Sequence, residues 1–556
     1  MKKSLSTLAA LGVGLVCAAL LLWLWRENRE GQRLLRTARE TASSLNPQRS
    51  TPRSSSPSAV PADLDPVTRS LLASLQRLLT RSDSRAKEGL LTFKDADAYR
   101  RFLARAKAAG LTLLGELPSL RTVRVRYDSF SALEADLAQH VADYAAVSAN
   151  YLVNLPSSSP PPAKEDRATV NQVPFGNTAL AFLGVPAEHS QWGKGVTIAI
   201  LDTGVLPDTT FGEGRLRTLD IGLGTVAGRG SEDGHGTAVA ALAAGAATDA
   251  PGVAPAASLL SIRVTDTSGT SDTFTVAQAI LAAVDAGAKV INVSLGGYST
   301  TPALDAAIAY ATTRGAIIVA AAGNDQAAQL TWPAADSRVI SVGAVDRAGQ
   351  QVTFSNSGPQ LSLTAPGYGV QTAWLDRQRV YVDGTSASAP LVAGAIAAAL
   401  SQNSSLTPQS AAQLLVQTAS DAGAPGADSD YGRGILNLDW AMNRSNPTHF
   451  DPAIASHYFD AASNQMQFVI QNRSGAAVAG LQLNVTTSGG TTAATLFPIP
   501  PLAAGETYIA TLPVDSAALK SAGAITYATQ LTNPPGLTDS APANNRKTST
   551  LSAPPK

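Results

Sequence analysis

The chain is organised around residues 383–394, which read Asp-Gly-Thr-Ser-Ala-Ser-Ala-Pro-Leu-Val-Ala-Gly. A glycine that permits a sharp turn precedes an apolar, alanine-rich run, and Pro390 suits the first turn of a helix, where a missing N–H is harmless. We therefore predict a loop that runs straight into a buried helix, with Ser386 at its positive end. There a hydroxyl can attack a carbonyl while free backbone N–H groups stabilise the oxyanion. The simpler interpretation is a serine that caps a core helix.

Two upstream stretches supply partners for that hydroxyl. Residues 196–205, Val-Thr-Ile-Ala-Ile-Leu-Asp-Thr-Gly-Val, form an apolar run with a carboxylate, Asp202, near its end. Such runs are typical of buried parallel strands, and functional side chains gather beyond the carboxyl ends of these strands. Residues 233–237, Asp-Gly-His-Gly-Thr, place His235 in a loop between glycines, ahead of a helix expected over 238–247. Taken singly, these are an ordinary turn aspartate and an ordinary loop histidine.

Together, Asp202, His235 and Ser386 provide a carboxylate, a base and a nucleophile, in the chain order of subtilisin. On these motifs, residues from about 175 to 442 resemble a subtilisin-like serine protease, or subtilase. The resemblance implies that Asp202 orients and stabilises His235, which acts first as general base and then as general acid. It also implies that Ser386 forms the acyl-enzyme.

The resemblance extends to an oxyanion hole. Residues 317–325, Ile-Ile-Val-Ala-Ala-Ala-Gly-Asn-Asp, read as a buried strand that ends in a glycine and an amide. In this setting the family uses an asparagine, so Asn324 Nδ2 is expected to join the backbone N–H of Ser386 around the developing charge. The alternative is a turn asparagine after a strand.

A substrate-binding strand is implied as well. Residues 290–297, Val-Ile-Asn-Val-Ser-Leu-Gly-Gly, resemble the strand that pairs with the substrate backbone and lines the first specificity pocket. Small residues there let an extended peptide add as a further strand. The expected substrate-binding residues are Ser294, Leu295, Gly296 and Gly323.

The histidine motif separates this chain from sedolisin-type peptidases. Those enzymes share a Gly-Thr-Ser nucleophile loop but use a glutamate as the base and work in acid. The imidazole of His235 argues against them and predicts activity near neutral pH.

Composition restricts partners and cofactors. The net charge is zero, only 15% of residues are charged, and no basic block occurs, so no nucleic-acid partner is expected. Cys17 is the single cysteine, which excludes an intramolecular disulfide. The short loop 246–251 lacks the asparagine-rich ligand run of calcium-binding subtilases, so neither calcium, another metal nor a cofactor is predicted.

Residues 1–40 predict export. An apolar run over about 8–25 follows Lys2 and Lys3, and no Ala-x-Ala cleavage site follows it, which favours an uncleaved signal-anchor over a removed signal peptide. A lipoprotein modified at Cys17 is a weaker alternative. The arginines that follow the run would keep that side in the cytoplasm, whereas resemblance to exported subtilases places the protease outside, membrane-anchored or secreted.

The rest of the chain divides into five further segments, since 556 residues is too long for one core. We predict a Ser/Pro-rich linker (41–66), a ferredoxin-like domain (67–154), a second linker (155–173), the catalytic domain (174–445) and an all-β sandwich (446–556). The domain over 67–154 resembles the inhibitory propeptide of subtilases, which implies maturation within 155–173, and the sandwich resembles Ig-like modules of exported bacterial enzymes.

Strand and helix patterns support these assignments. The propeptide segment alternates as βαββαβ, with a last strand expected over 145–153; a generic ferredoxin-like module is the alternative. The catalytic segment alternates strands and helices as a doubly wound, mostly parallel α/β sheet does. The expected propeptide elements are 89–93, 96–109, 111–114, 122–127, 132–140 and 145–153. The expected catalytic elements are 258–264, 271–286, 289–293, 303–314, 316–321 and 339–345, and the sandwich strands are 466–472, 481–486, 507–512 and 525–531.

The functional prediction is a serine endopeptidase made as a self-processing precursor. Its expected partners are extended polypeptides, its own propeptide and, through the N-terminal segment, a membrane. The first self-cleavage is expected near 151–154, with the Pro-rich 157–162 equally open. The alternative is an inactive subtilisin-like scaffold whose C-terminal β module binds a surface partner.

Overall fold

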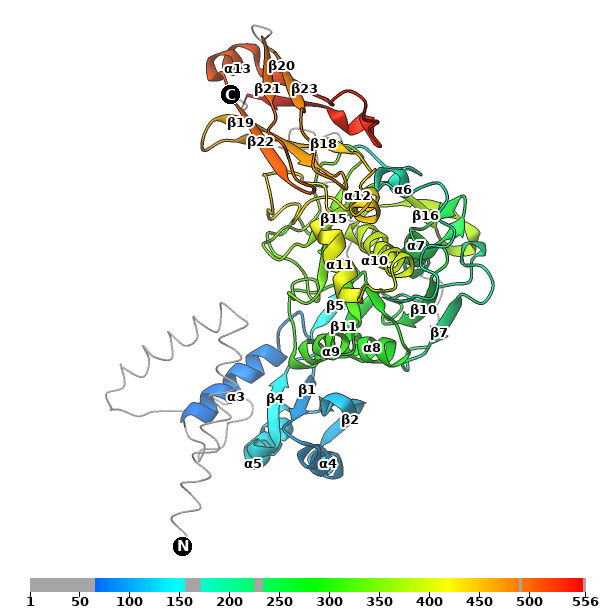
Figure 1. The fold of residues 1–556 in the computed structure, drawn as a ribbon. Helices are drawn as coiled ribbons and strands as arrows, with labels where there is room; N and C mark the ends of the chain where they lie inside the picture. Colours follow the sequence, from blue (N-terminus) through cyan, green and yellow to red (C-terminus); the bar gives the residue numbers. More distant parts are fainter. Residues whose placement is uncertain (1–65, 156–171, 225–233, 490–492, 554–556) are drawn as a thin grey trace, which may run out of the picture. The chain divides into compact units, whose positions relative to one another are not determined.

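The computed structural model describes residues 66–155, 172–224, 234–489 and 493–553 (Figure 1). The predicted N-terminal segment, nearly all of the first linker and most of the maturation region lie outside these residues. Among the helices in the described ranges, none is long and apolar enough to span a bilayer. The described chain forms two compact units. Residues 66–152 with 272–278 and 300–307 make the first, and the remainder makes the second.

The first unit contains a four-stranded antiparallel sheet with the strand order β2-β3-β1-β4. Phe93 lies at its centre, with the ring of Phe102 at 4.9 Å and that of Tyr144 at 5.0 Å between centroids. The element order matches the predicted βαββαβ pattern. Helix α3 (Pro66–Leu79) precedes β1 (Glu88–Phe93), α4 (Ala96–Arg105), β2 (Leu111–Leu117), β3 (Thr122–Tyr127), α5 (Phe130–His140) and β4 (Tyr144–Ser148).

The expectation of one continuous strand over 145–153 is wrong. The chain leaves the sheet after β4 and forms a second strand, β5 (Leu152–Asn154), which pairs with β11 (Thr270–Asp272). Asn150 lies at the break. It is fully buried, and its Oδ1 accepts hydrogen bonds from Phe274 N at 3.1 Å and from Thr273 Oγ1 at 3.2 Å. These bonds hold the chain beside the start of helix α8 (Thr273–Asp285), where it leaves the sheet.

The second unit is built on a seven-stranded parallel sheet with the order β15-β14-β13-β12-β6-β10-β7. From the central β6 the chain first builds one side, through β7 and β10, and then the other, from β12 to β15. This is the predicted doubly wound arrangement. The strands are β6 (Thr197–Asp202), β7 (Leu216–Leu219), β10 (Ser258–Arg263), β12 (Val290–Val293), β13 (Ile317–Ala321), β14 (Ile340–Val345) and β15 (Leu363–Pro366).

Alanine-rich helices bury one face of this sheet. The core combines strand residues with α7 (His235–Ala244), α10 (Thr385–Gln402) and α11 (Pro408–Gln417). Helices α7 and α10 approach so closely that a methyl group at Gly394 would meet the carbonyl oxygen of Ala243. Small side chains therefore allow the two helices to pack closely, and the predicted site residues His235 and Ser386 lie in their first turns. Helices α8 (Thr273–Asp285) and α9 (Pro302–Thr313) connect β10 to β12 and β12 to β13.

Two local expectations in this region are corrected. His235 is the first residue of α7 rather than a loop residue, and the helix ends at Ala244 rather than at 247. The chain then forms a short hairpin from β8 (Ala246–Ala247) and β9 (Ala250–Pro251). The tie between Thr210 Oγ1 and Ala250 O, at 2.8 Å, holds this hairpin and ends the helix early.

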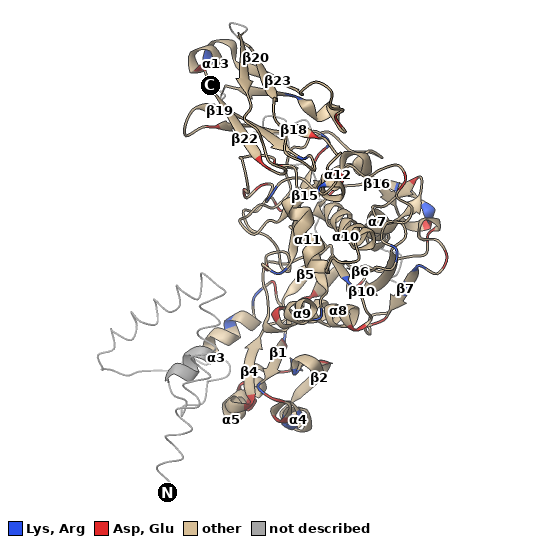
Figure 2. Cartoon of the chain, in the orientation of Figure 1, with Lys and Arg blue, Asp and Glu red and all other residues tan. Residues whose placement is uncertain are grey.

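The C-terminal part is the predicted all-β sandwich. Its two sheets, β18-β19-β22 and β21-β20-β23-β24, share one apolar core that includes Phe468, Leu483 and Tyr527. Acidic and basic side chains are interspersed over its elements, as they are over the other described elements (Figure 2). The strands are β18 (Pro452–Asp460), β19 (Gln465–Asn472), β20 (Gln482–Ser488), β21 (Ala493–Pro498), β22 (Thr507–Pro513), β23 (Ala524–Thr532) and β24 (Arg546–Ser552), with α13 (Ser516–Ala522) between β22 and β23.

His457 is largely buried in this sandwich. Its Nδ1 lies 2.8 Å from Ser549 Oγ and its Nε2 lies 2.7 Å from Thr529 Oγ1. The ring stands edge-on to Phe468 at 5.0 Å. Burial, together with the charge of Lys547, lowers the pKa of His457 to about 3.

This pKa predicts that acid destabilises the sandwich. The unfolded histidine takes up a proton near pH 6.5, whereas the folded one does so only near 3. The unfolded state then binds more protons across that window, so the free energy of unfolding falls as pH falls below 6.5. Urea midpoints at pH 7.5 and 5.0 measure the loss. It should be smaller in His457→Gln than in the parent, and equal losses would contradict the prediction.

Candidate active site

Strand β6 and helix α7 bring Asp202 and His235 together. His235 Nδ1 lies 2.8 Å from Asp202 Oδ1, which also accepts a hydrogen bond from Thr203 N at 2.7 Å. Thr203 Oγ1 accepts from Gly236 N at 3.0 Å and so ties the start of the helix to the end of the strand. Because a carboxylate only accepts, this contact places the proton on Nδ1 and leaves Nε2 as the basic nitrogen.

The carboxylate of Asp202 is completely buried. Its second oxygen, Oδ2, has no hydrogen-bond partner among the described residues. A buried anion that is short of donors is stabilised most by a positive charge beside it. The imidazole of His235 lies beside this carboxylate.

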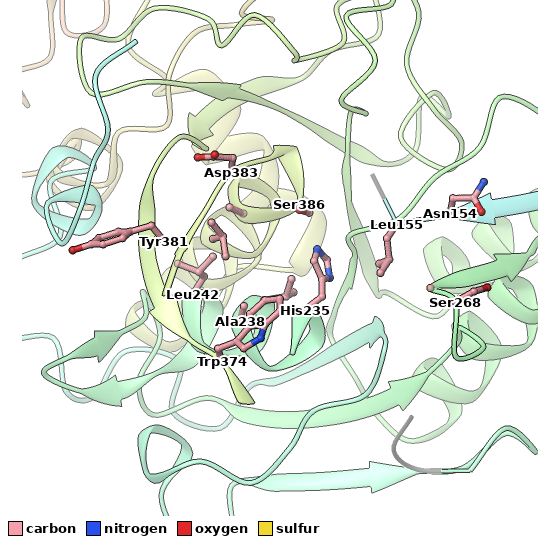
Figure 3. Close-up of a pocket in the computed structure, with 14 residues that line it drawn as sticks. Asn154, Leu155, His235, Ala238, Leu242, Ser268, Trp374, Tyr381, Asp383 and Ser386 are labelled. Carbon is pink, nitrogen blue, oxygen red and sulfur yellow. The ribbon is translucent and has the colours of Figure 1, made fainter. Parts of the chain in front are cut away.

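Helix α10 carries Ser386 as its second residue. The helix begins after Gly384, whose φ of 137° lies in the region that favours glycine. Ser386 and His235 line the same cleft of about 570 Å³, together with Leu242, in the second unit (Figure 3). The serine hydroxyl therefore lies at a helix N-terminus, as the sequence predicts, in the cleft that also holds the histidine.

The expectation that Pro390 occupies the first helical turn is wrong, because the helix begins five residues earlier, at Thr385. A proline inside a helix cannot donate to the carbonyl four residues before it, which here is the carbonyl of Ser386. Ser294 Oγ donates to that oxygen at 3.2 Å instead and accepts from Asn292 Nδ2 at 2.9 Å. Ser294 thus positions the backbone of Ser386.

Asn324 follows β13 and faces the start of α10. Its Oδ1 accepts from Thr385 N at 2.9 Å and from Thr385 Oγ1 at 2.8 Å, which fixes the orientation of the amide. A methyl group at Gly384 would lie 2.9 Å from Asn324 Nδ2 and 2.9 Å from Ser386 Oγ. The amide and the hydroxyl therefore border one small space, which only glycine leaves open, and an oxyanion formed there would meet the Nδ2 donor.

The predicted substrate-binding strand pairs with the chain itself. Gly296 N donates to Asn154 O and Gly296 O accepts from Asn154 N, both at 2.9 Å. Leu155 N donates to Gly269 O at 3.3 Å. Residues 154–155 thus lie between two backbone segments as an extended strand. They line the cleft that holds His235 and Ser386.

The remaining predicted residues of this strand have different surroundings. Leu295 is completely buried, and Gly297 exchanges two backbone hydrogen bonds with Trp332. Gly323 N donates to Thr385 Oγ1 at 3.2 Å, and its carbonyl accepts from Asn356 N at 3.0 Å. Gly323 therefore supports the position of Asn324, whereas Gly296 offers its backbone to an extended chain.

A tyrosine lies next to the amide-bearing loop. The hydroxyl of Tyr298 donates to Asp325 Oδ2 and accepts from Asn356 Nδ2 at 3.0 Å. Burial, followed by the bond to the aspartate, raises the pKa of Tyr298 to about 12. The phenol therefore stays neutral throughout the neutral and mildly alkaline range.

Several residues that shape the site were not predicted from the sequence. Thr203 and Thr385 are adjacent in sequence to Asp202 and Ser386, so the motifs contained a signal for them. Trp374 and Tyr381 also line the cleft. These two aromatic residues lie outside every motif, so nothing in the sequence indicated them.

Comparison with known proteins agrees with this geometry. The family described as "Subtilase family" matches residues 193–434. A thermostable alkaline protease of Halalkalibacterium halodurans is 34% identical over 281 residues, which cover 49% of this chain and 75% of that protein. Subtilisin Savinase of Lederbergia lenta is 34% identical over 276 residues, which cover 48% of this chain and 98% of that protein.

A solved structure extends the likeness in fold beyond the catalytic part. Fervidolysin from Fervidobacterium pennivorans, described as a keratinolytic enzyme related to subtilisin, superposes with a TM-score of 0.56 at 22% identity. The superposition covers 85% of this chain and 77% of that one. The fold and site define a subtilisin-like serine protease. The chain belongs to the subtilase family and is a serine endopeptidase of that family.

The bond from Ser294 to the Ser386 carbonyl can be tested against Pro390. Ser294→Ala should lower the free energy of unfolding by about 1–3 kcal/mol, because a buried carbonyl loses its donor. In a Pro390→Ala background the N–H of residue 390 can replace that donor, so the same change should cost less. Urea denaturation of the four chains gives the coupling energy.

Ser294→Ala also removes the hydrogen bond from Asn292 Nδ2 to Ser294 Oγ. This loss occurs with either residue at position 390, so it cancels in the coupling energy. A coupling energy of zero would mean that Ser294 does not substitute for the N–H that Pro390 lacks.

Proposed function

We propose that this subtilase hydrolyses peptide bonds through an acyl-enzyme formed on Asp202, His235 and Ser386. The contact between His235 Nδ1 and Asp202 Oδ1, in the cleft that Ser386 also lines, carries the proposal. The Oγ of Ser386 attacks the scissile carbonyl carbon while His235 Nε2 accepts the hydroxyl proton. The imidazolium then gives that proton to the leaving amine as the carbon–nitrogen bond breaks. In the second half of the reaction, His235 Nε2 accepts a proton from a water molecule, whose oxygen attacks the acyl carbon. The imidazolium then returns the proton to Ser386 Oγ as the ester bond breaks, and the acid product leaves.

The oxyanion is stabilised by two donors in this proposal. Asn324 Nδ2 supplies one, and its direction is supported by the two bonds from Thr385 to Oδ1. The backbone N–H of Ser386 supplies the other, because the first N–H groups of a helix have no partner within the helix. Both donors are held before reaction, so little reorganisation is needed as charge develops.

An extended polypeptide binds by β-strand addition in this scheme. Gly296 offers a backbone donor and acceptor, and Gly269 offers a carbonyl on the opposite side. Main-chain pairing of this kind gives affinity without selecting a side chain. Ser294 and Leu295 precede Gly296 in the same segment. Gly323 lies next to the Asn324 amide and borders the proposed substrate site.

We further propose that residues 67–154 are an inhibitory propeptide and that the chain processes itself. Support comes from Asn154 and Leu155, which pair as a substrate would and lie in the catalytic cleft. Since the upstream residues already pair as a bound strand, the first cut is expected C-terminal to Leu155. This favours the Pro-rich region over the 151–154 alternative.

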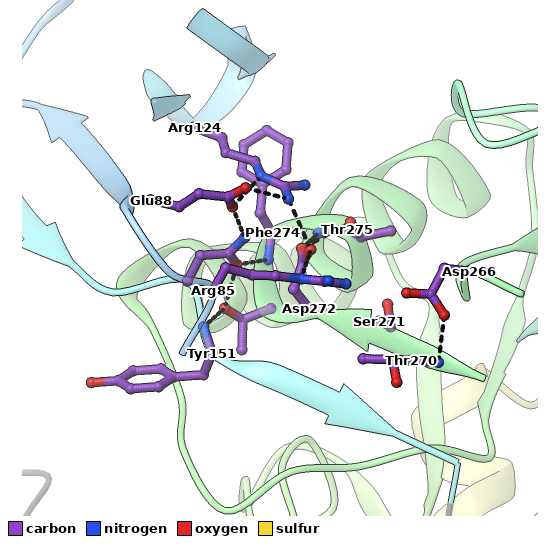
Figure 4. Close-up of polar contacts among 12 residues, drawn as sticks. Arg85, Glu88, Arg124, Tyr151, Asp266, Thr270, Ser271, Asp272, Phe274 and Thr275 are labelled. Atoms are coloured by element: carbon purple, nitrogen blue, oxygen red, sulfur yellow. Dashed lines mark hydrogen bonds and ion pairs between the residues drawn. The ribbon is translucent and has the colours of Figure 1, made fainter. Parts of the chain in front are cut away.

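Contacts within the first unit support a propeptide that remains bound after that cut. Arg124 donates to Glu88 at 2.8 Å and pairs with Asp272 Oδ2 at 3.2 Å, and Arg85 pairs with the same oxygen at 3.2 Å (Figure 4). Asp272 is only 2% exposed. The proposed propeptide segment is therefore also bound by charge-assisted contacts to Asp272, the residue before α8. Its binding does not depend on the backbone pairing of its tail alone.

Export is proposed from the sequence of residues 1–40, either with retention as a membrane anchor or with release. The inactive scaffold, with binding by the C-terminal module, stays the second hypothesis. It is disfavoured because the nucleophile, base, carboxylate and oxyanion amide are all present in suitable surroundings.

Ser386→Ala should remove both self-processing and hydrolysis of casein, because no acyl-enzyme can form. The parent should lose its N-terminal part by a cut between residues 156 and 162, whereas the variant stays at full length. N-terminal sequencing and intact-mass measurement of both chains show this. Equal maturation and equal casein hydrolysis would support the inactive-scaffold hypothesis instead.

Asn324→Leu should lower kcat by about 10²–10³-fold with little change in KM, because it removes a donor that acts mainly in the transition state. Initial rates on a chromogenic peptide measure both constants. Asn403→Leu, at the exposed far end of the same helix, is the matched control and should leave both unchanged. A rise in KM without loss of kcat would assign Asn324 to substrate binding.

A further inference from the structure

Three potential metal ligands converge where the catalytic part of the second unit continues into the β-sandwich. Asp439 lies in the short helix α12 (Leu438–Asn443), and His449 and Asp451 lie just before β18. One ligand atom from each of the three lies within 4.8 Å of the others. The site is separate from the triad and shares no residue with the cleft.

His449 is the distinctive member of the group. It is only 8% exposed, and its Nε2 has no hydrogen-bond partner among the described residues. Ser540 Oγ lies 3.2 Å from Nδ1, and Asp439 Oδ2 lies 3.5 Å from Nε2. A buried imidazole nitrogen without a partner is unfavourable. In a metal-binding histidine, one ring nitrogen is held by a hydrogen bond and the other faces the metal and its further ligands. The ring of His449 has this arrangement, with Nδ1 at Ser540 and Nε2 facing a carboxylate.

Both carboxylates are held by amides. Asn544 Nδ2 donates to Asp451 Oδ1 at 2.7 Å, and Asn443 Nδ2 donates to Asp439 Oδ1 at 2.9 Å. Such outer partners orient a ligand while leaving its other oxygen for a metal. Asp451 is 2% exposed, and the side chain of Asp439 is 35% exposed, which gives an ion access from solvent.

The three ligands and the side chains around them carry more negative than positive charge. Arg473 is buried and lies in the electrostatic field of three carboxylates, those of Asp421, Asp439 and Asp451. Its Nε donates to Gln471 Oε1 at 3.1 Å. Asp539 also acts on Asp451, and Lys547 is the other cation near Arg473. Arg433 is a third cation and acts on Asp421. The four carboxylates outnumber these three cations, so a further positive charge would be favourable.

We propose that Asp439, His449 and Asp451 bind a divalent transition-metal ion of the zinc class. One imidazole nitrogen with two carboxylate oxygens suits zinc, cobalt or manganese better than calcium or magnesium, which prefer oxygen-only shells. In a tetrahedral zinc site the ligand atoms lie about 3.4 Å apart, so small side-chain rotations would close the present spacing. No metal was predicted from the sequence, since that prediction rested on the loop 246–251 and did not consider these three residues.

The role of such an ion would be structural. It would link α12 to the start of β18 and so fasten the sandwich to the catalytic part. A metal that binds only the folded chain stabilises it by mass action. Metal addition should therefore raise the melting temperature without being needed for peptide hydrolysis.

The test uses the full chain with Ser386→Ala, which prevents self-digestion, after removal of metal by a chelator. Calorimetric titration with Zn²⁺ should show one equivalent bound, and Co²⁺ should give visible absorption bands of an imidazole-containing site. His449→Gln should weaken Zn²⁺ binding at least tenfold and abolish the bands. Asp439→Asn, at a partly exposed position that tolerates change, should weaken binding as well.

Two further variants separate this site from others. His189→Gln is the matched control, because both ring nitrogens of His189 face backbone carbonyls, and it should bind Zn²⁺ like its parent. His235→Gln reports zinc held at the triad. No binding by the parent at millimolar Zn²⁺, or binding that depends on His235 and not on His449, would overturn the proposal. Either result would leave His449 as an ion-pair partner of Asp439.

Discussion

The active site depends on one tie between strand and helix, the pair of hydrogen bonds from Thr385 to Asn324 Oδ1. This tie fixes the start of α10 against the carboxyl end of β13. It also turns the amide so that Nδ2 faces the space beside Ser386 Oγ, which Gly384 leaves open. In the proposed mechanism, this contact sets the place of the nucleophile and the direction of the oxyanion donor. The proposed donor is oriented before a substrate arrives, as an effective oxyanion hole requires.

Residues 294–297 contact both the backbone of Ser386, the proposed nucleophile, and the extended chain at Asn154. Ser294 donates to the Ser386 carbonyl, which Pro390 leaves without a helical donor, and Gly296 pairs with the extended chain. Gly297 exchanges two backbone hydrogen bonds with Trp332, which fixes the end of the segment. If Ser386 and an extended peptide react as proposed, one short segment contacts both, and a shift of the peptide relative to the serine would require that segment to move. Pro390 leaves the Ser386 carbonyl without a helical donor, and this is the carbonyl to which Ser294 donates.

Much of this arrangement was predictable because it rests on short, local patterns. Apolar runs that end in Asp202 or Asn324 indicated buried strands, and parallel strands gather their carboxyl ends at one edge. The break at Asn150 and the place of Pro390 were not predictable, because each depends on a partner distant in sequence. Polar edge strands such as β24 contain no apolar run that would mark them. His449 and its carboxylates gave no signal, since their convergence exists only after two domains pack.

If residues 67–154 are the proposed inhibitory propeptide, the affinity of their tail for the cleft matters. The three main-chain hydrogen bonds of residues 154–155 to Gly296 and Gly269 are worth about 0.5–1.5 kcal/mol each. Their sum, roughly 2–4 kcal/mol, corresponds to dissociation constants of about a millimolar or weaker. A tail of this kind would leave the cleft as readily as any peptide product. In the proposed precursor, durable inhibition would therefore have to come from the folded part of the segment, whose arginines pair with the nearly buried Asp272. Under this proposal, unfolding or digestion of that folded part, rather than cleavage of the tail, would release the enzyme.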